Sequence, residues 1–256
     1  MDSLTKTTNV MKKTLLVSTL LFAFGFTGYS QGLNVGVNLG YGIGAGNMVL
    51  GVSSTQNTEE NVVGSLGQGF QAALNINYMF NPNLGLELGL GVLSGKEIEI
   101  TQNTDFFEES MTMKATMFRV MPGIRVSAGD DKALAPYSKF GVAFGFGTKL
   151  VLSENYTDEF GSGFIEYEYS EGVSIGWYGA FGVGFKVSDK LSLNTELLLI
   201  NQSWAPGKEK NTVNSSGPVD PPVTFEDEVS IYSNKELTTR VPLGSLGLNV
   251  GVLYRF

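Results

Sequence analysis

Apolar and polar residues alternate through eight segments of the chain, and this alternation predicts β-strands with two different faces. In the first segment, apolar side chains occupy every second position from Leu33 to Ile43, with asparagine and glycine between them. The other segments cover residues 70–80, 84–92, 118–126, 139–147, 175–186, 191–199 and 245–256. Pro122 lies within the fourth segment, and we expect a β-bulge there because proline cannot donate to a strand ladder.

The connections between these segments alternate in length. Three are short, at residues 81–83, 128–132 and 188–190, and four are long, at about 46–68, 101–110, 152–172 and 201–239. Short turns on one side and long loops on the other are typical of outer-membrane barrels. We therefore predict an all-β fold, an eight-stranded antiparallel up-and-down transmembrane β-barrel. An even number of strands puts both termini on the short-turn side, in the periplasm, and the long loops outside the cell.

The alternation alone leaves open which face points outward. A soluble, lipocalin-like barrel would hide its apolar face and expose a polar face rich in lysine and glutamate. Here the polar face consists mostly of Gly, Ala, Asn and Ser, and small residues suit the crowded interior of an eight-stranded barrel. The apolar face suits lipid, where only a closed barrel leaves no unpaired strand edge. The sequence therefore favours the membrane barrel over the soluble one.

The first thirty residues have the features of a secretory signal peptide. Met11-Lys12-Lys13 precedes the apolar run 15–26, and Gly28 and Ser30 provide small residues before a cleavage site after Ser30. A membrane anchor is the alternative, but the run is shorter than the roughly 20 residues that a spanning helix needs. We predict a signal peptide over residues 1–30, with residues 1–10 as an upstream extension, and a barrel over residues 31–256.

Composition narrows the range of functions. Charged residues make up 16% of the chain, below the roughly 25% usual in soluble domains. The net charge of −8 argues against a nucleic-acid partner, because such proteins normally carry a basic stripe. The chain has no histidine and no cysteine, so the commonest general base and metal ligand are missing. We therefore expect no enzymatic activity, no metal site and no cofactor.

The last nine residues, from Leu248 to Phe256, resemble the closing strand of outer-membrane barrels, which has a terminal Phe with an aromatic residue two positions before it. Over about residues 33–256, the pattern is similar to the small outer-membrane β-barrel family, of the OmpA-barrel, OmpX and OmpW types, often called porin-like. The resemblance implies that the barrel-assembly machinery reads Tyr254 and Phe256 as an insertion signal. Phe256 is alternatively a lipid-facing residue of an aromatic girdle, and both roles are compatible.

Few charged residues fall on the inward face of the predicted strands. They are Glu87, Arg119, Arg125, Lys139, Lys186, Glu196 and Arg255. Because a buried charge without a partner is costly, we expect Glu87 and Glu196 to pair with a nearby Arg or Lys, with Arg119–Glu196 as the preferred mid-lumen pair. The network is either a packed polar core that closes the barrel, which we favour, or a gate in a narrow ion path.

The long connections are acidic. Residues 152–172 contain six carboxylates and no basic residue. They predict either contacts with lipopolysaccharide through divalent cations, binding of an extracellular ligand, or simply a solvated, repulsive surface. Together these features predict an outer-membrane surface protein with a structural or adhesive role. The alternative is a narrow channel for small or apolar solutes.

Overall fold

The structure is a computed structural model, and it describes residues 32–46, 48–55, 58–103, 107–129, 132–159, 161–215, 217–219, 221–226, 236–237 and 239–256. The predicted signal peptide lies outside these residues. The eight predicted segments form the long strands β1 (Gly32–Gly44), β4 (Gly69–Asn81), β5 (Leu84–Gly95), β7 (Phe107–Ser127), β8 (Leu134–Asp158), β10 (Ser174–Lys186), β11 (Leu191–Trp204) and β16 (Ser245–Arg255). In the described part of the chain, no helix is long and apolar enough to cross a membrane.

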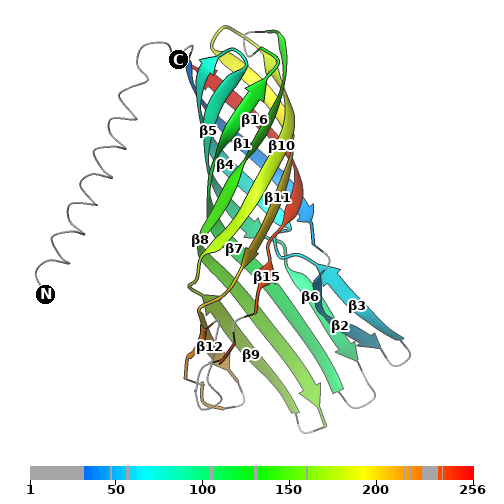
Figure 1. The fold of residues 1–256 in the computed structure, drawn as a ribbon. Coiled ribbons are helices and arrows are strands. Elements are labelled where there is room, and N and C mark those ends of the chain that lie inside the picture. The colour runs from blue at the N-terminus through cyan, green and yellow to red at the C-terminus, as the bar shows by residue number, and fades with distance from the viewer. Residues whose placement is uncertain are drawn as a thin grey trace, which may run out of the picture.

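These eight strands pair in a closed ring. The antiparallel pairings run from β1 through β4, β5, β7, β8, β10, β11 and β16 and return to β1. Leu39 of β1, for example, lies opposite Ala72 on one side and Val250 on the other. Each strand of the ring therefore has a partner on both sides, and the up-and-down barrel fold is confirmed (Figure 1).

The two faces of the barrel wall are chemically inverted relative to a soluble protein. Along β1, Asn34 and Asn38 are buried, whereas the apolar neighbours Leu39 and Ile43 are exposed. Phe181 in β10 is 75% exposed. This arrangement confirms that the small and polar face forms the interior, the lumen, and that the Leu, Val, Ile and Phe face forms the outer surface. Such a surface is stable in hydrocarbon and not in water.

The two ends of the barrel differ. At the turn end, the connections after β4, β7 and β10 are short. In the first of these turns, the Asn81 side-chain carbonyl accepts hydrogen bonds from the backbone N–H groups of Asn83 and Leu84, both at 2.9 Å. The chain end at Phe256 lies at the same end, where its N–H donates to the carbonyl of Leu33. Figure 1 shows the turn end at the top.

At the opposite end of the barrel, which we call the sheet end, strands extend far beyond the ring and form a projecting sheet (Figure 1). Its order is β3-β2-β6-β7-β8-β9-β12-β13-β14. The additional strands are β2 (Met48–Thr55), β3 (Thr58–Gly64), β6 (Ile98–Asn103), β9 (Gly161–Ser170), β12 (Lys208–Asn214), β13 (Val223–Glu226), β14 (Glu236–Leu237) and β15 (Val241–Pro242). Much of what the sequence predicted as long loops is therefore strand, because β7 and β8 continue their pairing and recruit neighbours.

The pairing of β7 with β8 contains a bulge, but the extra residue lies in β8 and not at Pro122 of β7. Val120 opposite Phe144 and Gly123 opposite Gly141 keep one register across the proline, whereas the register shifts between Thr116 and Phe118. The predicted position of the bulge is therefore wrong. The shift lies beside Gly147, whose φ of 57° is a left-handed conformation that glycine adopts without strain. It marks the level at which the projecting sheet leaves the barrel.

Candidate functional site

Three charged side chains meet in the half of the lumen nearer the turn end. The ammonium nitrogen of Lys139 on β8 lies 2.9 Å from Glu87 Oε1 on β5 and 2.9 Å from Glu196 Oε2 on β11. The side chains are 3–4% exposed. We call Glu87, Lys139 and Glu196 the triad. It joins three separate strands across the lumen and carries a net charge of −1.

Glu196 is the best-bonded member of the triad. Its oxygens accept hydrogen bonds from the side chains of Asn38 at 3.0 Å, Tyr137 at 2.9 Å and Asn249 at 3.2 Å. Charge-assisted hydrogen bonds of this kind stabilise an ionised carboxylate that burial would otherwise penalise. The guanidinium of Arg125 lies 3.8 Å from the centre of the Tyr137 ring, so a second cation stands next to the triad.

Arg119 does not pair with Glu196, and that prediction is wrong. Its guanidinium donates hydrogen bonds to the side-chain oxygens of Gln202 at 3.0 Å and Gln71 at 3.4 Å and to the carbonyl of Leu243 at 3.2 Å. The strands are tilted, so residues at similar distances from their turns lie at different heights. Arg119 is consequently level with the last residues of β11, nearer the sheet end than the triad.

An apolar plug closes the lumen at the sheet end. Its members are Leu66, Leu93, Ile100, Met113, Ala115, Met117, Leu150, Trp204 and Leu243. Leu66 and Leu243 come from segments that fold into the barrel mouth, where Ser65 Oγ donates to the carbonyls of Gly244 at 2.7 Å and Pro242 at 3.0 Å. The plug was not predicted from the sequence. However, continuing the inward-facing positions of β11, which are every second residue, beyond residue 199 leads to Trp204.

Between the plug and the triad, the lumen is filled by side chains. A buried cluster contains Met121, Ala143, Tyr178, Ala180, Leu198 and Ile200. Two cavities were found inside the barrel wall, one on either side of this cluster, and each has about 20 Å³ that a water molecule can occupy. Such a volume holds about one water. The described side chains therefore fill most of the lumen at these levels.

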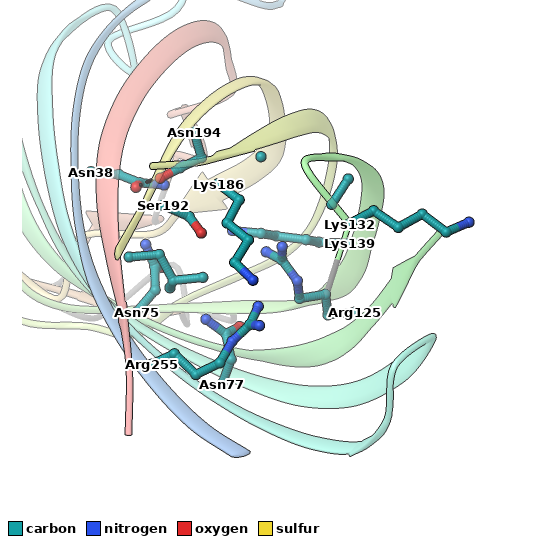
Figure 2. A pocket seen from close by; sticks show the side chains of 13 residues that line it. Asn38, Asn75, Asn77, Arg125, Lys132, Lys139, Lys186, Ser192, Asn194 and Arg255 are labelled. Carbon is teal, nitrogen blue, oxygen red and sulfur yellow. Dashed lines mark hydrogen bonds between the residues drawn. The ribbon is translucent and has the colours of Figure 1, made fainter. Parts of the chain in front are cut away.

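The remaining inward cations lie at the turn end. Lys186 and Arg255 line a pocket together with Arg125 and several asparagines (Figure 2). Lys186 Nζ lies 2.9 Å from Asp189 Oδ1 in the neighbouring turn, and this hydrogen bond lowers the pKa of Asp189 below its ordinary value. Arg125, Lys186 and Arg255 thus form a separate group between the triad and the barrel end.

Tyr254 and Phe256 are exposed neighbours on the outer surface. Their ring centroids are 5.0 Å apart in an edge-to-face arrangement. Phe256 is 71% exposed, so it is accessible as a lipid-facing girdle residue. Its role as an assembly signal stays a prediction.

The projecting sheet carries most of the described acidic residues. Lys149 and Glu168 form an exposed ion pair at 3.1 Å. Partial burial and the neighbouring carboxylate of Glu109 raise the pKa of Glu154 above its ordinary value. Among the described residues, no group of three or more His, Cys, Asp or Glu side chains could hold a metal ion.

One protein family matches most of the chain. The sequence pattern of the family described as outer membrane protein beta-barrel domain matches residues 14–216. The fold is distantly similar to Neisserial surface protein A (12% identity, 89% of this chain, 99% of that chain, TM-score 0.44) and to OprG from Pseudomonas aeruginosa (12%, 90%, 98%, 0.47). It is also similar to Ail, the attachment invasion locus protein of Yersinia pestis (10%, 88%, 99%, 0.38). No curated protein matches the chain.

Proposed function

Because the chain belongs to the outer membrane protein beta-barrel domain family, we propose that it is a non-enzymatic surface barrel with a structural or adhesive role. In this proposal, the lumen does not conduct ions or solutes, and the projecting sheet is the surface that contacts other molecules. The protein resides in the outer membrane, as its family does. The turn end faces the periplasm with both termini, and the sheet end faces outward.

The packed lumen is the observation that carries this proposal. The triad bridges three strands near the turn end, and the plug fills the mouth at the sheet end. The inner parts of the cavities in the barrel, with about 20 Å³ accessible to water in each, are too small for a hydrated ion or a solute to pass. A barrel filled in this way resists deformation, because interiors packed by side chains have low compressibility.

The projecting sheet supports the surface role. It extends the barrel by strands with solvated, acidic side chains, which suits contact with other molecules and not burial in lipid. An extracellular ligand, or lipopolysaccharide phosphates bridged by divalent cations, would meet this surface first. Outer-membrane lipid would cover the apolar belt of the barrel.

Conductance of the folded protein in planar bilayers tests the closed lumen. We expect no steady open-channel current from the wild-type protein. The alternative, a narrow channel for small or apolar solutes, requires a reproducible current or solute uptake that saturates with concentration. Either observation would overturn the closed-barrel proposal.

Epitope insertion tests the orientation. A tag inserted after Thr55, in the β2–β3 hairpin, should react with antibody on intact cells. A tag after Asp189, in the turn between β10 and β11, should react only after the outer membrane is permeabilised. The reverse pattern would place the projecting sheet in the periplasm and exclude a role at the cell surface.

A further inference from the structure

The pocket at the turn end gathers cations without a carboxylate in its lining. Thirteen residues line it, and Arg125, Lys132, Lys139, Lys186 and Arg255 are its charged members. Figure 2 shows the ends of Arg125, Lys186 and Arg255 directed toward one another, whereas Lys132 points away. Like charges held this close repel each other unless an anion stands between them.

Carboxylates lie close to this group of cations. The triad, with two glutamates and one lysine, contributes −1, and Asp189 pairs with Lys186. Lys186 still has further donors available, because an ammonium group has three. The charged side chains that line the pocket itself are all cations, and such a lining suits an anion.

We propose that this pocket binds the phosphate group of a small phosphorylated molecule or of a lipid headgroup. Guanidinium groups bind phosphate oxygens with paired, charge-assisted hydrogen bonds, and lysine adds a point charge. The side chains of Asn77 and Ser192 also line the pocket and supply neutral donors. No part of the proposal depends on what the projecting sheet binds.

The size of the pocket limits how the ligand enters. The space free of protein atoms is about 430 Å³ when the open mouth is included, but only about 20 Å³ inside can be occupied by water. The smaller value describes the inner part, since it excludes open solvent. One phosphate group would therefore sit at the mouth, between Lys186 and Arg255, and the rest of the ligand would stay outside.

Calorimetric titration of the folded, detergent-solubilised protein with inorganic phosphate tests this site. Ionic strength is held constant with chloride, because salt screens such contacts. We expect saturable binding of one phosphate per chain. Lys186→Gln and Arg255→Gln should each weaken it about tenfold, the effect of losing one charge-assisted hydrogen bond.

Lys190→Gln is the matched control, because Lys190 is an exposed lysine of the same end that does not line the pocket. It should change the affinity less than about twofold, since exposed charges are screened by solvent. Equal weakening by Lys190→Gln and Lys186→Gln would show a diffuse charge effect and overturn the proposal. Absence of saturable phosphate binding would overturn it as well. Since Arg255 adjoins the C-terminal aromatics, Lys186→Gln provides an independent result if Arg255→Gln fails to fold.

Reconstitution identifies the source of the phosphate. The protein is placed in phosphatidylcholine vesicles with or without phosphatidylglycerol, and the phosphate titration is repeated. Loss of phosphate binding with phosphatidylglycerol supports a lipid headgroup at the site. Unchanged phosphate binding supports a soluble phosphate compound of the periplasm.

Discussion

Replacing Lys139 with methionine should destabilise the barrel far more than replacing any surface lysine. Lys139 is the shared cation of Glu87 and Glu196, and all three side chains are 3–4% exposed. Methionine keeps most of the volume of the lysine side chain but leaves two carboxylates without their counter-charge. Among the described residues, Glu87 Oε2 already has no hydrogen-bond partner, so Glu87 depends most strongly on Lys139.

The expected magnitude comes from the cost of breaking a buried ion pair, which is about 3–5 kcal/mol when one partner is removed. Two carboxylates share the lost lysine, so the upper part of that range applies. Glu196 retains three hydrogen bonds from neutral donors, which limits the loss at that position. We therefore expect Lys139→Met to lower the free energy of unfolding by about 4 kcal/mol.

Urea unfolding in lipid vesicles, followed by tryptophan fluorescence and by the gel shift between folded and boiled protein, measures this change. Lys149→Met is the matched control, because Lys149 and Glu168 form an ion pair that is 55% and 30% exposed. Its cost should be below about 1 kcal/mol. The neutral triple variant Glu87→Gln, Lys139→Met, Glu196→Gln should recover most of the stability. If Lys139→Met costs no more than Lys149→Met, the triad does not stabilise the barrel as argued.

Three further predictions concern other parts of the chain. Brominated acyl chains should quench the fluorescence of Trp177, which is 41% exposed on the outer face, and not that of the fully buried Trp204; single-tryptophan variants separate the two. Because the pKa of Glu154 is raised in the folded state, its stabilising contribution should be present at acidic pH and be lost as pH rises through that value. The protection factors of β8 and β9, which correct hydrogen exchange for its intrinsic pH dependence, should therefore rise on acidification in the wild type and in Glu59→Gln, and this rise should disappear in Glu154→Gln. Phe256→Ala should reduce the amount of assembled barrel in cells but not spontaneous folding in detergent, and equal defects in both would argue for a purely structural role.

The barrel wall could be predicted from the sequence because a membrane barrel imposes a strict two-residue period. From Leu33 to Ile43, for example, every outward position is apolar and every inward position is Asn or Gly. The projecting sheet could not be predicted in this way. Its strands are solvated on both faces over much of their length, so segments such as Thr58–Gly64 carry no alternation that distinguishes a strand from a loop.

The inward charges could be assigned to the lumen from parity, but their partners could not. Pairing depends on the height of each residue along tilted strands, and that height follows from the shear of the barrel, which a single sequence does not reveal. Lys139, and not Arg119, is consequently the residue that meets Glu196. The plug could be predicted only in part, because Trp204 continues the inward positions of β11, whereas Leu66 and Leu243 belong to connecting segments outside the alternating strands.

The two closures of the lumen lie in series, and this arrangement makes a final prediction. The triad blocks the half nearer the turn end, and the plug blocks the sheet end, with the Met121 and Tyr178 cluster between them. Current through a series path requires the triad, the cluster and the plug all to be opened.

Only a variant that combines Trp204→Ala, Lys139→Ala and Glu196→Ala with Met121→Ala and Tyr178→Ala, which open the cluster between the triad and the plug, should therefore show current in planar bilayers, provided that its gel shift confirms a folded barrel. The matched control combines Lys149→Ala and Glu168→Ala, which remove an exposed ion pair of the projecting sheet, with Trp204→Ala. This control variant should show no current, because the triad is intact. Steady current from Trp204→Ala alone would mean that neither the triad nor the cluster seals the lumen, since the plug would then be the sole barrier between the two sides of the membrane.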